Sequence, residues 1–436
     1  MTEPPPRIWA RLPFYAGWLI VAIACVTMAV SVTTRTAYSL LLPPLLDEFG
    51  WSRGAVAGAF SFGFLASALV SALAGRSIDR HGPRRVILTG AALMAAGLFL
   101  PPLIAAPWQL YATLGLLVGV GVNLMSYLVQ SLYLPHWFVR RRALALGIAF
   151  SGVGAGAVVL LPWLQTVIAG AGWRAACTAL GLIVLLAVVP LNLFVRHRPQ
   201  DVGLLPDGAA APPPGSAPAA DRRVVDAAWA ATEWTLARAA RTGRFWWLAL
   251  GYFCALVAWY AVLVHQTAYL VEIGFAPLTA AWALGLVSIV AIPGQIGLGA
   301  LADRIGREWI WTIGCAGFVL CYAALIALAA ASSPALLYLM VAVQGGIGYA
   351  LVSVMGPIVV EIFEGPHYGS IFGTLNVLMI GGGAAGPWMA GAIYDTTGSY
   401  TPAFLLAIAC SVVSAIAIWQ AAPRKVRRVR GPAPPG

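Results

Sequence analysis

The sequence 75–85, GRSIDRHGPRR, decides the fold, because it stands between two long apolar runs and recurs later in the chain. A shorter copy, GALADRIGR, occupies 299–307 and again lies between apolar runs. Both follow the pattern Gly-x-x-x-Asp-Arg-x-Gly, and the second lies 224 positions after the first. The segments 48–51, EFGW, and 272–275, EIGF, are separated by the same 224 positions. A duplicated unit of several helices explains this regularity better than chance does.

The composition around these repeats is that of a membrane protein. Apolar residues form 61% of the 436 positions and charged residues only 9%, whereas a soluble domain carries roughly 25% charged residues. This balance excludes a disordered chain and a nucleic-acid-binding globule, and it disfavours a soluble enzyme. The six cysteines all fall inside apolar runs without a CxxC pair. They are therefore predicted to be core residues, with no disulfide and no metal site.

Twelve apolar runs are long enough to cross a bilayer, which takes about 20 residues of helix. The predicted spans are 15–42, 54–76, 84–104, 107–134, 143–168, 174–195, 245–271, 279–301, 308–331, 334–360, 368–393 and 400–421. We therefore predict an all-α membrane protein with twelve transmembrane helices in two six-helix bundles. The predicted divisions are an N-terminal tail (1–14), a first bundle (15–195), a linker (196–243), a second bundle (244–421) and a basic C-terminal tail (422–436).

The positive charges agree with this map. If the N-terminus is cytoplasmic, 23 of the 26 Lys and Arg residues fall on the cytoplasmic side, as the positive-inside rule requires. The three exceptions are Arg35, Arg53 and Arg174. The net charge of +11 is thus explained by topology rather than by a nucleic-acid partner, and both termini are predicted to be cytoplasmic. Within the linker, 229–244 is predicted either as an amphipathic helix on the cytoplasmic face or as a short turn leading into the next span.

The 75–85 segment resembles the signature loop between helices 2 and 3 of the major facilitator superfamily, and 299–307 resembles its weaker copy. The likeness extends over nearly the whole chain, and it implies two bundles around a central cavity that opens to each side in turn. The segments 43–56, 198–208, 234–250 and 265–275 resemble the bacterial monocarboxylate and oxalate–formate branches. The animal monocarboxylate carriers have an acid and an arginine one turn apart in helix 8, whereas Ser288 and Ile292 stand there in this chain.

What the resemblance implies is a secondary transporter of a small organic anion, a monocarboxylate, working by alternating access with proton symport or anion exchange. It further implies a monomer in the bacterial inner membrane, with no cofactor and no enzymatic activity. The alternative is an efflux antiporter that exchanges drugs or amphiphiles for protons. That activity needs an acidic residue deep in the cavity, and spans 1, 4 and 7 carry none away from their ends.

Polar residues inside the spans are the candidates for substrate binding, because they are costly in lipid. Arg35 stands about 20 residues into span 1, before Pro43 and Pro44, which are expected to end the helix. Its guanidinium is suited to bind a carboxylate through two hydrogen bonds, although it could instead reach the outer interface. His265 is read equally well as a carrier of the coupled proton or as a neutral core residue. The substrate-binding set is Arg35, Tyr38, Asn123, Tyr127, Gln130, His265, Tyr269 and Asn376.

Helical spacing groups some of these candidates. Asn123, Tyr127 and Gln130 follow one another at i, i+4 and i+7, and so do His265, Tyr269 and Glu272, so each trio is expected on one helix face. For Glu272, a structural role is favoured over proton binding, since Glu48 matches it in the repeat. The glycine pattern at 152–157 is assigned to helix packing rather than to a dinucleotide site, because no strand precedes it.

The repeated loops and the arginines after span 4 are predicted to act in gating. Asp79 would bind backbone N–H groups or a nearby arginine and so hold the cytoplasmic side closed. Arg140, Arg141 and Arg142 could meet Glu361 and Glu364, or could be solvated topology charges. The gating set is Asp79, Arg80, Gly82, Arg141, Asp303, Arg304 and Glu361.

Overall fold

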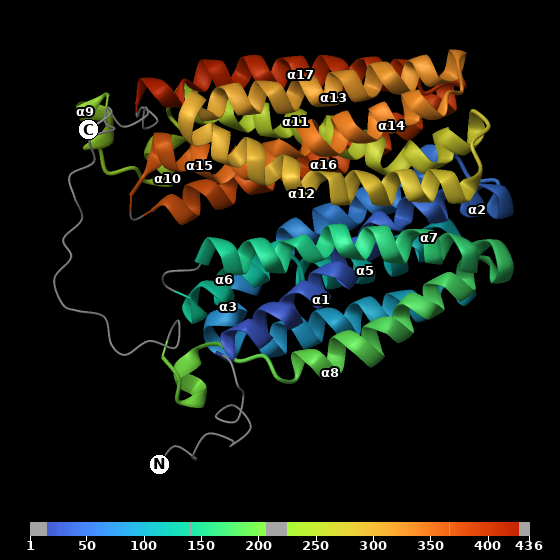
Figure 1. The fold of residues 1–436 in the computed structure, drawn as a ribbon, viewed down its shortest axis with the longest axis horizontal. Helices are drawn as coiled ribbons and strands as arrows, with labels where there is room; N and C mark the ends of the chain where they lie inside the picture. The colour runs from blue at the N-terminus through green and yellow to red at the C-terminus, as the bar shows by residue number, and fades with distance from the viewer. Residues whose placement is uncertain (1–14, 139–141, 206–224, 366, 427–436) are drawn as a thin grey trace. The chain divides into compact units, whose positions relative to one another are not determined.

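The computed structural model describes residues 15–138, 142–205, 225–365 and 367–426, and the described residues form helices and no strand (Figure 1). They divide into two compact units. The first unit contains Met1–Pro44 and Phe62–Pro218, and the second contains Leu45–Ser61 and Ala219–Gly436. The end of the first apolar run and the start of the next thus pack with the second half of the chain. This docked segment brings Arg53 into the second unit.

The first unit is built from long helices interrupted at a few positions. Its helices, some of them shared with the second unit, are α1 (Gly17–Thr36), α2 (Tyr38–Phe49), α3 (Arg53–Phe99), α4 (Pro107–Leu110), α5 (Val118–Asn123), α6 (Tyr127–Trp137), α7 (Arg142–Ile183) and α8 (Val189–Asn192). Two π-helical segments, Tyr111–Leu117 and Val184–Val188, join α4 to α5 and α7 to α8.

The second unit follows the same plan. Its helices are α9 (Ala227–Ala230), α10 (Leu236–Ala239), α11 (Gly243–Glu272), α12 (Pro277–Ile305), α13 (Arg307–Ala330), α14 (Pro334–Ala342), α15 (Leu351–Phe363), α16 (Tyr368–Thr397) and α17 (Thr401–Ala421). A π-helical segment, Val343–Ile347, and a short 3₁₀ turn, Gly348–Ala350, lie between α14 and α15.

Within the described residues, ten stretches are long and apolar enough to cross a membrane, whereas the sequence predicts twelve spans. One of them, Ala145–Asn192, contains two predicted spans that meet at Gly172, where φ is 84°. The predicted span 107–134 is not among the ten because it is divided among α4, a π-helical segment, α5 and α6. These two cases account for the difference between ten and twelve.

The repeated motif has the same backbone shape in both copies. Its last glycine is Gly82 in the first copy, with φ 76° and ψ 163°, and Gly306 in the second, with φ 105° and ψ 149°. Side chains with a Cβ rarely adopt positive φ, so glycine is needed where one helix turns into the next. The sequence repeat is therefore also a structural repeat, in which each copy joins two helices through a kink.

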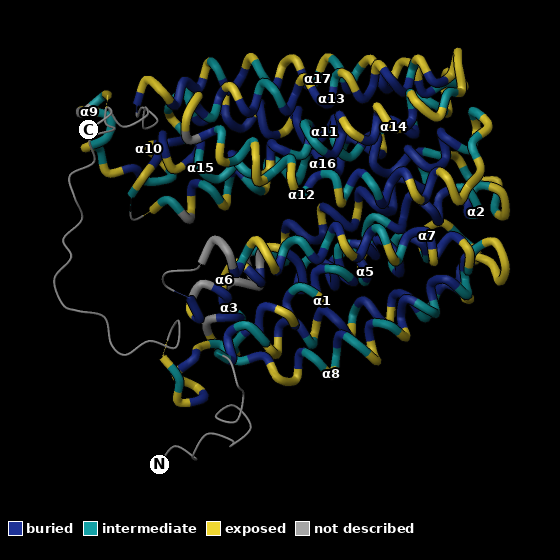
Figure 2. Tube along the Cα trace, in the orientation of Figure 1, coloured by how far each residue is buried: buried dark blue, intermediate teal, exposed yellow. Residues whose placement is uncertain are grey.

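Burial explains how the helices of the second unit are ordered. α11 is the central helix, with twenty of its thirty residues buried, and it packs against α16 and α17 (Figure 2). On α17 the buried positions recur every three or four residues, which is the spacing of one helix face. They are Ala403, Phe404, Ala407, Ser411, Ser414, Ala417, Ile418 and Ala421. The opposite side of α17 is exposed and faces away from this core (Figure 2).

Two local predictions are corrected by the structure. Pro43 and Pro44 do not end a helix but lie inside α2, which continues to Phe49. Prolines are tolerated within membrane helices because neighbouring groups satisfy the freed backbone. The segment 229–244 does not form one amphipathic helix: α9 and α10 have four residues each, and Trp229 Nε1 donates to the Ile362 carbonyl at 2.8 Å. Packing of this tryptophan on α15 replaces the predicted surface helix.

The prediction for the glycine pattern at 152–157 is confirmed. A Cβ on Gly152 would lie 2.2 Å from the Cys25 carbonyl oxygen of α1, so only glycine permits this contact between α1 and α7. The glycine pattern at 152–157 therefore serves helix packing. All six cysteines are free, and four of them are buried.

Candidate functional site

Arg35 lies in the last turn of α1 and is partly buried. Its guanidinium carbon is 5.2 Å from the centre of the Phe64 ring of α3, within the first unit. Among the ion pairs formed by the described residues, none includes Arg35. Tyr38, one turn further on, is buried at the start of α2. A cation on an aromatic ring keeps its N–H groups at the ring edge available to a carboxylate.

The predicted face of Asn123, Tyr127 and Gln130 does not exist, because the helix breaks between the first two residues. α5 ends at Asn123, the backbone is extended at Ser126, and α6 begins at Tyr127. The i, i+4, i+7 argument holds only for a continuous helix. Tyr127 is exposed, and its ring packs edge-on against the Phe150 ring, with centroids 4.9 Å apart.

The two amides stabilise this break rather than open a cavity. Asn123 Nδ2 donates to the Ser67 carbonyl at 3.1 Å and to Ser71 Oγ at 2.9 Å, which ties α5 to α3. Buried Gln130 donates to the Met125 carbonyl at 3.0 Å and accepts from the Tyr133 hydroxyl at 2.7 Å. Buried amides are stable only when satisfied in this way. Asn123 thus hydrogen-bonds between helices, whereas Gln130 bonds to groups of its own helix and of the turn before it.

His265 is completely buried in the middle of α11. Its Nε2 is 2.9 Å from the Pro387 carbonyl oxygen, and its Nδ1 is 2.9 Å from the Tyr400 hydroxyl. A carbonyl can only accept, so Nε2 carries the proton, and in the neutral ring Nδ1 accepts from Tyr400. Both nitrogens are thus engaged, which fits a neutral histidine that positions Tyr400.

Arg53, the first residue of α3, interacts with three elements of the second unit. Its Nη1 donates to the Tyr400 hydroxyl at 2.7 Å, and its Nη2 donates to Glu272 Oε2 at 2.9 Å. Its guanidinium also lies 3.8 Å from the centre of the Tyr394 ring. Tyr400 therefore accepts from Arg53 and donates to His265. Burial raises the pKa of the Tyr400 phenol, so this hydroxyl keeps its proton at neutral pH.

Asp395 holds the backbone of the same segment. Its two carboxylate oxygens accept from the N–H groups of Arg53 at 2.8 Å and Gly54 at 2.7 Å. A carboxylate placed on the first free N–H groups of a helix is favourable for both hydrogen bonding and the helix dipole. A Cβ on Gly391 would be 2.8 Å from the Gly54 Cα, so α3 and α16 touch backbone to backbone.

Glu272 and Tyr269 complete this group. The Glu272 carboxylate accepts from Arg53 and, at 2.8 Å, from the Tyr394 hydroxyl. Tyr269 places its ring edge-on to Tyr400, 5.7 Å between centroids, and donates to the Leu325 carbonyl at 2.7 Å. We call Arg53, His265, Glu272, Tyr394, Asp395 and Tyr400 the Arg53 cluster.

The sequence analysis missed Arg53, Asp395 and Tyr400 as functional residues. A signal for Arg53 was present, since it is one of three basic residues outside the cytoplasmic count. Glu272 stands at the same predicted end of its span and supplies the opposite charge. What the sequence lacks is any sign that the α2–α3 junction docks on the second unit.

The gating candidates are only partly described. Arg141 and the side chains of Asp79 and Asp303 lie outside the described residues. Arg80 and Arg304 are exposed, and Gly82 forms the kink in α3. Glu361, at the end of α15, is buried and forms an ion pair with Arg307, the last residue of the repeated motif. Asn376 is half-buried on α16.

The comparisons with known proteins agree with this arrangement. Residues 24–356 and 248–435 match the profile described as Major Facilitator Superfamily. Monocarboxylate transporter 13 of Rattus norvegicus is 25% identical over 93% of this chain and 87% of its own length. The oxalate:formate antiporter of Oxalobacter formigenes is 28% identical over 42% of this chain and 43% of its own. The crystal structure of the nucleoside transporter NupG (D323A mutant) has a TM-score of 0.70 at 13% identity, covering 93% of this chain and 99% of that one.

Proposed function

We propose, from the premise that this chain belongs to the Major Facilitator Superfamily, that it is a secondary active transporter of a small organic anion, a monocarboxylate. The observation that carries the proposal is the likeness to a monocarboxylate transporter over nine-tenths of the chain. Partial likeness to an oxalate:formate antiporter points to the same class of small carboxylates. Transport would proceed by alternating access, coupled to a proton or to exchange of anions.

Arg35 is the proposed carboxylate-binding residue. A charged side chain inside a membrane span is energetically costly, and binding of an anionic substrate would account for its presence there. Its guanidinium contacts a ring and, within the described residues, no carboxylate. Tyr38, Tyr127 and Asn376 are the proposed polar contacts around the substrate. Asn123, Gln130, His265 and Tyr269 use their hydrogen bonds on other protein groups, so we assign them to positioning the walls of the site.

The Arg53 cluster is the proposed gate at one end of the second unit. It ties the start of α3 to α11, α16 and α17 by hydrogen bonds that must break before these helices separate. On the predicted topology this is the outer end, with both termini in the cytoplasm and the chain in the inner membrane. The repeated loops, with Asp79, Arg80, Gly82, Asp303 and Arg304, are the proposed gate at the cytoplasmic end, together with Arg141 and Glu361.

Uptake by purified protein in liposomes tests the proposal. Labelled formate, acetate, lactate, pyruvate and oxalate are each offered with an inward proton gradient and, separately, with unlabelled anion inside. We expect uptake of at least one monocarboxylate, abolished by Arg35→Ala and retained by the matched control Arg174→Ala, whose guanidinium lies 4.5 Å from the Trp173 ring. Transport of amphiphilic cations against a proton gradient, without uptake of any acid, would favour the efflux alternative.

A further inference from the structure

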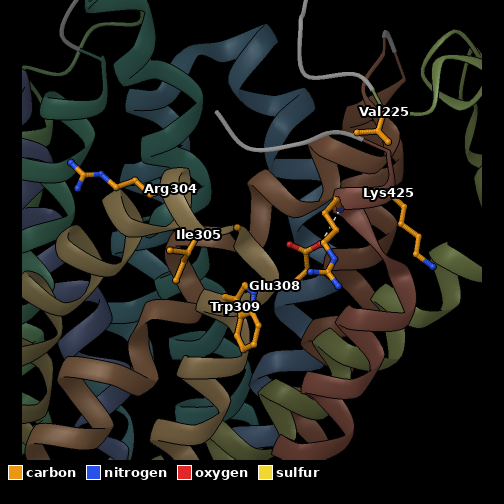
Figure 3. A pocket seen from close by; sticks show the side chains of 8 residues that line it. Val225, Arg304, Ile305, Glu308, Trp309 and Lys425 are labelled. Carbon is orange, nitrogen blue, oxygen red and sulfur yellow. Dashed lines mark hydrogen bonds between the residues drawn. The ribbon is translucent and has the colours of Figure 1, made fainter. Parts of the chain in front are cut away.

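A second candidate site lies apart from the Arg53 cluster, where α12 ends and α13 begins and beside the end of α17. A cavity of about 680 Å³ opens there, with Arg304, Ile305, Glu308 and Trp309 on one side and Arg424 and Lys425 on the other (Figure 3). The neighbouring spans are Pro277–Ala302, Arg307–Ala330 and Thr401–Lys425. The cavity thus sits at the ends of three spans, at the depth of the lipid headgroups.

The charge of the cavity is positive. Among the described residues that line it, three side chains are basic, and the one carboxylate, Glu308, is only 2% exposed. That carboxylate accepts from the Arg424 backbone N–H at 2.9 Å, which fixes the segment just after α17 to the first turn of α13. The Arg424 guanidinium lies 4.3 Å from the centre of the Trp419 ring. In Figure 3 Arg304 and Lys425 extend to opposite sides of the opening.

The same cavity has an apolar wall. Ile305 is 43% exposed and Trp309 47% exposed, so both are accessible to the apolar part of a lipid. The Trp309 and Trp419 rings meet edge-on with centroids 5.1 Å apart, and tryptophan is enriched at membrane interfaces. Free phosphate would contact only the basic side chains. A phospholipid would contact the basic side chains through its headgroup and the apolar wall through its acyl chain.

We propose that this cavity binds the headgroup of an anionic phospholipid. The phosphate diester would lie among Arg304, Arg424 and Lys425, and the glycerol and upper acyl chain would lie along Ile305 and Trp309. Basic pockets between helices at a membrane surface are suited to such headgroups. Because the loop of Arg304 and Gly306 is the second copy of the repeated motif, a lipid bound here contacts one of the kinks that join the spans.

Native mass spectrometry of the delipidated protein in detergent tests the proposal. Phosphatidylglycerol, phosphatidylcholine and inorganic phosphate are titrated separately. We expect phosphatidylglycerol to bind more tightly than phosphatidylcholine and not to be displaced by inorganic phosphate. Arg424→Gln with Lys425→Gln should weaken phosphatidylglycerol binding about 25-fold, since each basic residue near an anionic surface contributes roughly fivefold. Arg304→Gln, on an exposed side chain, should give a fivefold loss without disturbing the C-terminal turn.

The matched control carries the same change of charge elsewhere on the second unit. Arg238→Gln with Arg241→Gln alters two exposed arginines beside α10 and should leave phosphatidylglycerol binding within twofold of wild type. Three results would overturn the proposal: an equal loss in this control, equal binding of phosphatidylcholine, or displacement of the lipid by inorganic phosphate. The last result would identify a site for free anions instead.

Discussion

Arg35 lies inside the first apolar run and Arg53 at the start of the second, and the structure treats them in opposite ways. Arg53 has its guanidinium engaged by a carboxylate, a phenol and an aromatic ring, and its backbone N–H by a second carboxylate. Arg35 rests on one aromatic ring. An arginine whose donors are satisfied holds protein segments together, whereas an arginine with donors to spare can take up an anionic ligand. The comparison supports the proposed roles, which are a structural one for Arg53 and anion binding for Arg35.

Arg35→Ala should give the largest effect on transport. Loss of a two-pronged charged hydrogen bond to a carboxylate costs roughly 3 kcal/mol, or about 100-fold in uptake at low substrate concentration. Because Arg35 makes few contacts within the protein, the unfolding temperature should change little. Arg35→Lys keeps the charge but loses the planar guanidinium that can donate two hydrogen bonds to one carboxylate, so it should retain only part of the activity. Uptake by Arg35→Ala at the wild-type rate would contradict the role of Arg35 in substrate binding.

Arg53→Ala should show the converse pattern. It removes the donor of Tyr400 and one of the two donors of Glu272, so we expect a loss of about 2 kcal/mol in stability, measured as a lower unfolding temperature in detergent. Substrate binding should persist. A cysteine introduced next to Tyr394 should react faster with a thiol reagent than the same cysteine in a protein with Arg53, because the gate opens more often. Arg174→Ala is the control for removing a cation that lies on a ring. If Arg53→Ala left the unfolding temperature unchanged but abolished substrate binding, Arg53 rather than Arg35 would be the binding residue.

His265→Ala tests whether the buried histidine positions Tyr400 or carries the coupled proton. Removing the ring leaves the Pro387 carbonyl and the Tyr400 hydroxyl unsatisfied, each at a cost of about 1–3 kcal/mol. The protein should therefore lose stability, while any proton-driven uptake that remains should keep the pH profile of the wild type. Disappearance of the proton dependence alone, at normal stability, would establish His265 as the proton carrier.

The sequence predicts the helices well because lipid imposes one simple rule, a long apolar run for each span. It also identifies the two repeated loops, whose final glycines take the same backbone conformation. It fails where the argument assumes an unbroken helix, as between Asn123 and Tyr127, where an extended Ser126 separates α5 from α6.

Pairings across the chain are a second kind of failure. Arg53 and Glu272 are 219 residues apart, and only the docking of the α2–α3 junction brings them together. Local periodicity carries no information about such contacts. The count of basic residues draws attention to Arg53, and the sequence repeat draws attention to Glu272. Neither pattern predicts that the two side chains form an ion pair.

Glu272→Gln should give the smallest effect. It separates the contribution of the ion pair from the contributions of the other contacts in the Arg53 cluster. Its carboxylate is 38% exposed, so the ion pair with Arg53 contributes no more than about 1 kcal/mol. The amide keeps an oxygen that can accept from Arg53 or Tyr394 but loses the charge, and salt should reduce the remaining difference from wild type. Unfolding temperatures of both proteins at low and high salt measure this. If Glu272→Gln destabilised as much as Arg53→Ala, the ion pair would hold the gate; a small, salt-sensitive effect leaves that role to Tyr400 and Asp395.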